Sequence, residues 1–167
     1  MADGGPELLT RLLNEHAATL VLYARQWTRE PEDIVQNAFV QLMRERTAPA
    51  NVVGWLYRVV RNGAISAARS SATRARHESQ AAHRGEPWFA PNPGEAIDAK
   101  MATQALAALD PDLREVIVLR LWAGFSFEQI AELTQTSTST AHRRYAVGLT
   151  ALRERPAPCA NPTNQTT

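Results

Sequence analysis

Several residue types and sequence features that common functions require are scarce or missing in this chain. Among its 167 residues there is one cysteine, Cys159, which excludes an internal disulfide bond and a cysteine-based zinc site. No apolar run reaches the roughly eighteen residues that a transmembrane helix needs. Residues 1–6 lack a basic stretch followed by an apolar one, which predicts no secretory signal. These absences predict a cytoplasmic protein that has no membrane partner.

Residue patterns typical of catalysis are also missing. The four histidines, at positions 16, 77, 83 and 142, do not have the spacing of metal ligands, and there is no glycine-rich phosphate loop. Glu30, Glu32 and Asp33 are better explained as acidic residues in the first turn of a helix than as an acid–base pair. We therefore expect a protein that is not an enzyme and that needs no metal or other cofactor.

The charge of the chain is unevenly distributed. Seventeen of the 18 basic residues are arginine, and the formal net charge is +1. Residues 1–43 carry a net charge of −3 and residues 44–84 one of +6, whereas residues 85–136 carry −5 and residues 137–167 carry +3. Basic segments of this kind are typical of proteins that bind polyanions, although two solvated helix faces would give the same pattern.

Apolar residues recur at helical spacing through most of the chain, which predicts an all-α fold. Residues 8–27 form one long helix or two in series. A second helix begins at 30–33, where proline and acidic residues suit the first turn, and runs to about residue 45. A third begins near residue 51 and carries, opposite its apolar face, Arg58, Arg61 and Arg69.

The helical pattern stops at about Ser70. Residues 70–97 have little periodicity and contain three closely spaced prolines, which predicts a flexible linker. The Trp88-Phe89 pair within it would dock on a neighbouring helix or contact a partner. The predicted organisation is therefore two small helical domains, 6–69 and 98–155, followed by a disordered tail, 156–167. Cores of this size are marginal alone, so the halves would gain stability from a large partner.

The second half carries the signals of a helix-turn-helix. Helix is expected from about residue 96 to 109, and Asp110-Pro111 then begins a helix that ends at Gly124. Ser126 and Gln129 have capping-box spacing and open a short helix, which a break at 134–136 separates from a last helix, 137–155. Helix, tight turn and helix is the arrangement of this DNA-binding motif.

The last helix has two distinct faces at helical spacing. The inward stripe consists of four residues: Ala141, Tyr145, Gly148 and Leu152. The outward face consists of Ser139, His142, Arg143 and Ala146, with Arg144 at its edge. Polar and basic residues near the start of such a helix suit the major groove, where arginine pairs with guanine. An ordinary helical hairpin with a polar exterior is the alternative.

Four segments resemble conserved regions of bacterial RNA polymerase sigma factors, most closely the extracytoplasmic-function (ECF) type. Residues 109–120 and 124–133 resemble the fourth region, residues 32–39 the polymerase-binding motif of the second region, and residues 54–62 its promoter-melting helix. The resemblance covers about residues 7–69 and 99–153. Departures from the family pattern, which bear on polymerase affinity and promoter strength, are Asn37, Ser66, Gln135, Ala141 and Val147.

The resemblance implies a sigma factor that binds core RNA polymerase and directs transcription from promoters with −10 and −35 elements. A region 2-like three-helix bundle would bind the clamp helices of the largest polymerase subunit through Asp33, Gln36 and Asn37. It would contact the −10 element through Arg58, Arg61, Asn62 and Arg69, with added attraction from Arg74 and Arg76. A region 4-like helix-turn-helix would contact the −35 element through Ser139, Thr140, His142, Arg143 and Arg144.

Two other functions remain open from the sequence. A plain helix-turn-helix regulator would bind duplex DNA as a dimer without polymerase. A decoy would bind an anti-sigma factor without supporting transcription. An anti-sigma factor is also a candidate partner of a true sigma factor with this sequence.

Overall fold

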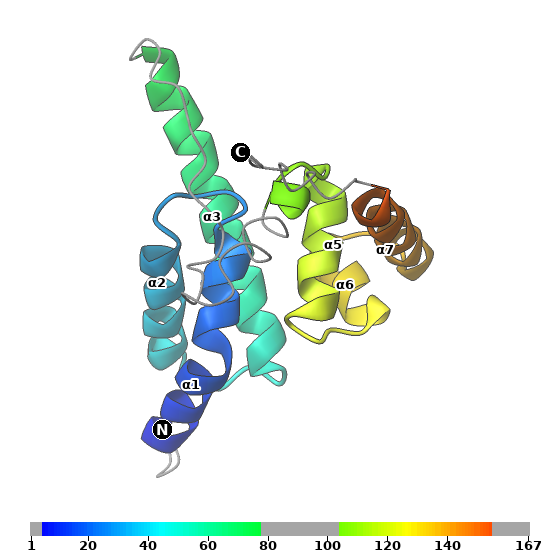
Figure 1. The fold of residues 1–167 in the computed structure, drawn as a ribbon. Coiled ribbons are helices and arrows are strands. Elements are labelled where there is room, and N and C mark those ends of the chain that lie inside the picture. The colour runs from blue at the N-terminus through cyan, green and yellow to red at the C-terminus, as the bar shows by residue number, and fades with distance from the viewer. Residues whose placement is uncertain (1–4, 78–103, 155–167) are drawn as a thin grey trace, which may run out of the picture.

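The computed structural model describes residues 5–77 and 104–154, and all regular structure in these two ranges is helical. Figure 1 shows the six labelled helices: α1 (Gly5–Ala24), α2 (Pro31–Arg44), α3 (Val52–His77), α5 (Pro111–Leu121), α6 (Phe127–Thr134) and α7 (Thr138–Arg153). A short helical segment, 104–107, precedes α5. The all-α fold with two small helical domains is confirmed. We call α1–α3 the N-terminal bundle and 104–107 with α5–α7 the C-terminal bundle.

The N-terminal bundle forms because each of its helices has one apolar face. In α2, Pro31 occupies the first turn with two acidic residues beside it, as the sequence predicts, and the apolar face buries Val35 and Phe39. These side chains pack against Leu56 of α3 and Leu20 of α1, both fully buried. Asn51 precedes α3 and caps its first turn, since its Oδ1 accepts a hydrogen bond from the Gly54 N–H at 2.9 Å.

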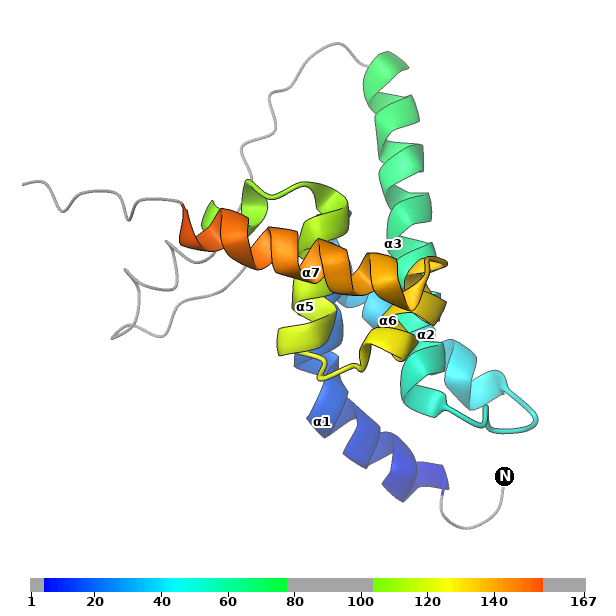
Figure 2. The same cartoon turned by 90° about the vertical axis from the view of Figure 1, so that its right-hand side faces the viewer.

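Helix α3 is longer than the sequence analysis predicts. We expected the helical pattern to stop at about Ser70, but the helix continues to His77 and projects beyond α1 and α2 (Figures 1 and 2). The prediction was wrong because apolar periodicity reports packing against a core, whereas residues 70–73 are exposed and residues 70–77 contain no glycine or proline to end the helix. The rest of the predicted linker, with Trp88-Phe89, and the predicted tail lie outside the described residues.

The C-terminal bundle is held together by capping interactions as well as by its core. The Arg114 guanidinium donates to the carbonyl oxygens of Leu106, Ala107 and Leu109 at 2.7–2.9 Å, which fixes the segment before α5. Asp110 stands at the N-cap of α5, but its side chain makes no capping hydrogen bond.

Both helices of the helix-turn-helix have the caps that the sequence predicts. Ser126 and Gln129 form a reciprocal capping box at the start of α6, and the Ser137 hydroxyl accepts from the Thr140 N–H at 3.1 Å at the start of α7. The turn between them places Gln135 in the left-handed region, at a φ of 56°. Most L residues are strained in this conformation, so the tight turn is made at the expense of local stability.

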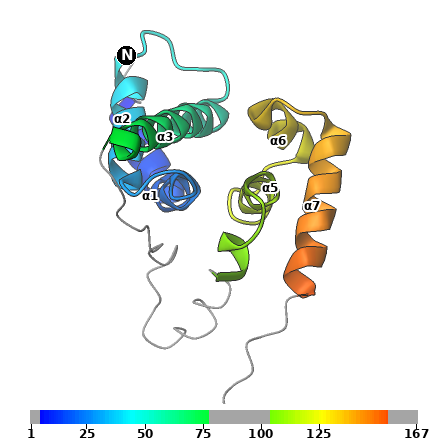
Figure 3. The same cartoon turned by 90° about the horizontal axis from the view of Figure 1, so that it is seen from above.

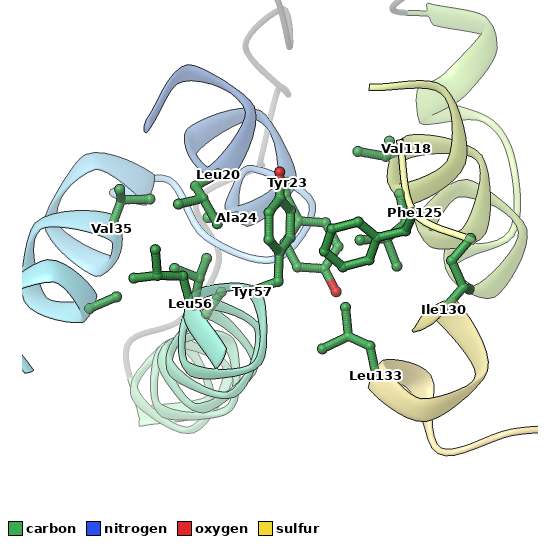
Figure 4. Packing of buried hydrophobic residues seen from close by; sticks show 14 of the residues in the cluster. Leu20, Tyr23, Ala24, Val35, Leu56, Tyr57, Val118, Phe125, Ile130 and Leu133 are labelled. Carbon is green, nitrogen blue, oxygen red and sulfur yellow. The ribbon is translucent and has the colours of Figure 1, made fainter. Parts of the chain in front are cut away.

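The two bundles lie side by side (Figure 3) and share a core, which the sequence analysis did not anticipate. One continuous cluster of buried side chains includes residues of both bundles. At its centre the rings of Tyr57 and Phe125 meet edge to face, with centroids 4.8 Å apart, and Tyr23 and Leu133 lie beside them (Figure 4). Each bundle therefore buries apolar surface of the other, which compensates for the small size of its own core.

The strained turn gives a test of the helix-turn-helix geometry. We expect Gln135→Gly to raise the free energy of unfolding by about 1 kcal/mol, because glycine adopts a positive φ without a Cβ clash. The matched control is Gln41→Gly on the exposed side of α2, which should lower that free energy by about 1 kcal/mol. Urea unfolding followed by circular dichroism measures both. Equal destabilisation by the two substitutions would contradict the left-handed turn.

Candidate nucleic-acid interface

A buried carboxylate, Glu115 of α5, joins the two bundles. Its side chain is only 6% exposed. One of its oxygens accepts from the Arg61 Nε at 2.7 Å and from the Tyr23 hydroxyl at 2.6 Å, and the other accepts from an Arg61 Nη at 3.3 Å. The three side chains come from α5, α3 and α1. The carboxylate therefore has charged and neutral donors that offset the cost of its burial.

The protonation states of Tyr23 and Arg61 are set by their environment. Burial, and then the neighbouring charge of Glu115, raise the pKa of the Tyr23 phenol well above its ordinary value. The hydrogen bond to Glu115 raises the pKa of the Arg61 guanidinium. Tyr23 therefore remains a neutral hydrogen-bond donor and Arg61 a cation at any pH near neutrality.

A second ion pair crosses between the bundles near their surface. An Arg58 Nη donates to a Glu132 carboxylate oxygen at 2.7 Å, with the side chains 52% and 73% exposed. Exposed pairs of this kind contribute about 0–1 kcal/mol. The pair lines a small pocket between the loop before α3 and helix α6, together with Trp55 and Phe125.

The residues that the sequence assigns to the −10 element are not equally available. Arg58 and Arg61 lie on the side of α3 that faces the C-terminal bundle, and both are paired with its carboxylates. Asn62 and Arg69 are exposed. In this arrangement α5 and α6 supply acidic residues opposite Arg58 and Arg61, which the sequence analysis did not anticipate. Arg74 and Arg76 belong to α3, but their side chains lie outside the description.

The residues assigned to polymerase binding lie together on α2. Asp33, Gln36 and Asn37 are all exposed. Asn37 lines a shallow pocket between α2 and α3 with Val40 and Val59. The surface that they share is on the N-terminal bundle and is not covered by the C-terminal bundle.

The outward and inward faces of α7 are as the sequence predicts. Ala141 is fully buried and Gly148 is buried against Ile117, where a Cβ atom would lie 2.6 Å from the Ile117 Cδ1. Tyr145 and Leu152 complete the stripe and are partly buried. The exposed face consists of Ser139, His142, Arg143 and Ala146. Helix α7 lies on the side of the C-terminal bundle away from the N-terminal bundle (Figure 3).

Four residues of the predicted −35 set have partners within the C-terminal bundle, including Ser139, whose hydroxyl lies 3.0 Å from the Ser137 hydroxyl. Arg144 pairs with Asp112 of α5, which explains its position at the edge of the outward face. The Ser137 hydroxyl donates to the Thr140 hydroxyl at 2.8 Å. The His142 ring lies on the Phe127 ring, with centroids 3.7 Å apart and an angle of 31° between the planes.

Five residues of these contacts were missed by sequence reasoning: Tyr23, Asp112, Glu115, Phe127 and Glu132. The sequence did contain one indication that Glu115 is buried. The four residues that follow it, 116–119, are all apolar, and in the structure all four are fully buried, so α5 is apolar around most of its circumference. A carboxylate within so apolar a helix is expected to be buried and paired. The sequence does not identify its partner, because Arg61 lies 54 residues away.

Comparison with known proteins identifies the two bundles. The family model of Sigma-70 region 2 matches residues 12–74, and that of Sigma-70 region 4 matches residues 99–152. RNA polymerase sigma factor CarQ from Myxococcus xanthus is 28% identical over 162 residues, which cover 91% of each chain. The ECF RNA polymerase sigma factor SigL from Mycobacterium tuberculosis is 30% identical over 158 residues, or 87% of each chain.

Two solved structures share the fold. The sigma factor RpoE from Bartonella quintana, in complex with the anti-sigma factor NepR, superposes with a TM-score of 0.71 and 24% identity, covering 89% of this chain and 95% of that one. CnrH, in complex with the cytosolic domain of CnrY, superposes with a TM-score of 0.63 and 21% identity, covering 91% and 89%.

These matches define a protein built from sigma regions 2 and 4. The chain belongs to the ECF group of RNA polymerase sigma factors. It accordingly acts in promoter-specific transcription initiation with RNA polymerase, and the plain regulator and the decoy are not favoured. None of the described helices is long and apolar enough to cross a membrane, and no group of metal-binding side chains occurs within the described residues.

The contact at Glu115 predicts which substitution separates the bundles. Glu115→Ala leaves Arg61 and Tyr23 without a buried acceptor, at a cost of about 3–5 kcal/mol in this arrangement. We therefore expect the full chain to open, with a larger radius of gyration in small-angle X-ray scattering. The matched control, Glu132→Ala, removes an exposed pair worth at most about 1 kcal/mol and should keep the parent radius. An unchanged radius for Glu115→Ala would contradict the role assigned to this carboxylate.

Proposed function

We propose that the two bundles read two elements of one promoter while α2 binds the core polymerase. The −35 element would be read by α7 through Ser139, Thr140, His142, Arg143 and Arg144. The −10 element would be contacted by α3 through Arg58, Arg61, Asn62 and Arg69. The exposed polar face of α7, in a helix-turn-helix that matches sigma region 4, is the observation that supports this proposal most strongly.

The −35 surface is accessible in the free chain. Three of its residues, Ser139, His142 and Arg143, are exposed on the outer side of the C-terminal bundle. They lie in the first turns of α7, and residues at the start of a recognition helix are those that reach base edges. The arginine can donate two hydrogen bonds to one guanine, which gives the contact its sequence preference.

Two of the −10 residues, Arg58 and Arg61, would become available only after the bundles separate. Arg61 and Arg58 are held by Glu115 and Glu132, so promoter phosphates have to compete with these carboxylates. Binding through a conformation that is seldom populated lowers the apparent affinity in proportion to its population. We infer that polymerase binding favours the separated form, because promoter elements about two dozen base pairs apart span roughly 80 Å at about 3.4 Å per base pair.

The polymerase contact would use Asp33, Gln36 and Asn37, which are exposed together on α2. The clamp helices of the largest polymerase subunit are the partner that the family resemblance implies. Because the match to sigma region 2 ends at residue 74, the N-terminal domain would include most of α3, and the linker would begin later than the predicted residue 70. The C-terminal domain would keep its predicted limits, 98–155.

In this proposal the polymerase supplies all the chemistry. The chain would be a cytoplasmic, non-enzymatic factor that selects the start site. An anti-sigma factor is a further proposed partner, because one solved structure with this fold is a complex with the anti-sigma factor NepR, and another is a complex with the cytosolic domain of CnrY.

Run-off transcription with purified bacterial core polymerase tests this function. We expect transcripts from a pool of promoters randomised at both elements only when the chain is present. Asp33→Arg should reduce transcript yield and holoenzyme assembly, since it reverses a charge on the proposed polymerase surface. The matched control is Glu15→Arg, the same type of change at an exposed position of α1. Tight binding of duplex DNA without polymerase, and no transcript with it, would instead favour the plain regulator.

A further inference from the structure

A cluster of side chains beside the outward face of α7 is centred on the Phe127 ring. Phe127, the first residue of α6, contacts His142 of α7 in the stack described above. The same ring meets Tyr145 edge to face, with centroids 5.4 Å apart, and the Arg120 guanidinium lies over it at 4.9 Å. Three side chains from α5 and α7 thus surround one ring of α6.

The Phe127 ring is itself held firmly in position. It follows directly after Ser126, whose capping box with Gln129 fixes the start of α6. Arg120 is tied to the backbone of the preceding loop, because one Nη donates to the Phe125 carbonyl oxygen at 2.8 Å. The surface on which His142 rests is therefore rigid on two sides.

This support matters because His142 is exposed and would otherwise change rotamer freely. An exposed histidine has three staggered χ1 positions and a broad χ2 distribution. Ordering such a side chain on binding lowers affinity, whereas a side chain that is already ordered avoids the loss. The same ordering restricts which base pair the imidazole nitrogens can reach.

We propose that Phe127, supported by Arg120, is a positioning residue that fixes the His142 imidazole for the reading of one base pair of the −35 element. The inference rests on the proposed function of α7 and adds how the side chain of His142, one of its proposed DNA contacts, is held in place. Phe127 itself need not touch DNA. Its role is to restrict the orientation of the His142 imidazole, so that the imidazole prefers one base pair over the others.

The test measures base preference rather than total activity. Holoenzyme reconstituted from core polymerase and the full chain transcribes a template pool randomised at the −35 element, and the transcripts are sequenced. We expect His142→Ala to abolish the preference at one position. Phe127→Leu should weaken the preference at that same position by about threefold to tenfold and leave the others unchanged. Phe127→Tyr, which keeps the ring, should retain it.

A double substitution separates positioning from folding. If Phe127 acts through His142, then Phe127→Leu should have no additional effect on base preference in a His142→Ala chain. A purely structural role would lower transcription from all templates equally, together with the unfolding midpoint, and would overturn the proposal. So would an unchanged base preference in His142→Ala, whatever the stability of the Phe127 variants.

Failure of this inference differs from failure of the proposed function. Arg143→Ala provides the comparison, because Arg143 is exposed on the same face and does not take part in the stack. If Arg143→Ala changes the −35 preference and neither His142 nor Phe127 variants do, only the positioning role is wrong. If the parent chain shows no −35 preference at all, the proposed function of α7 is itself wrong.

Discussion

The buried Glu115 carboxylate is the contact on which the arrangement of the molecule depends. Each bundle alone has a small core, and the edge-to-face contact of Tyr57 with Phe125 joins the two cores into one. Burial of a carboxylate beside these rings is tolerated because Arg61 and Tyr23 donate to it from the other bundle. The apolar contact thus supplies most of the buried surface between the bundles, and the Glu115 carboxylate determines which faces of the two bundles meet.

This contact makes the two proposed DNA surfaces unequal. Helix α7 lies on the side of the C-terminal bundle away from the N-terminal bundle and its polar face is exposed, whereas Arg58 and Arg61 of α3 are paired with carboxylates of α5 and α6. A free chain in this form would offer its −35 residues but not its full −10 set. The same residue pairs that stabilise the closed form would therefore lower promoter affinity until polymerase binds, which couples promoter recognition to assembly.

Local features could be predicted from the sequence, and contacts between distant residues could not. The capping box at Ser126, the cap at Ser137 and the two faces of α7 depend on residues within one or two turns, and all are confirmed. The extension of α3 to His77 was missed because residues 70–77 have no apolar periodicity in the sequence. The pairing of Glu115 with Arg61 was missed because the two residues are 54 positions apart, and nothing in the sequence of either bundle indicates a contact with the other. The proposed site residues on α2, α3 and α7 remain predictions about contacts with other molecules.

Directed DNA cleavage tests the central claim most directly. An iron chelate attached to a cysteine at position 62 or 143, in a chain carrying Cys159→Ser, cuts DNA next to the attachment point. In the holoenzyme–promoter complex, Asn62→Cys should cut within the −10 element and Arg143→Cys within the −35 element, about two dozen base pairs apart. Cleavage by both at one location, or an identical pattern without polymerase, would contradict two separate surfaces reading one promoter.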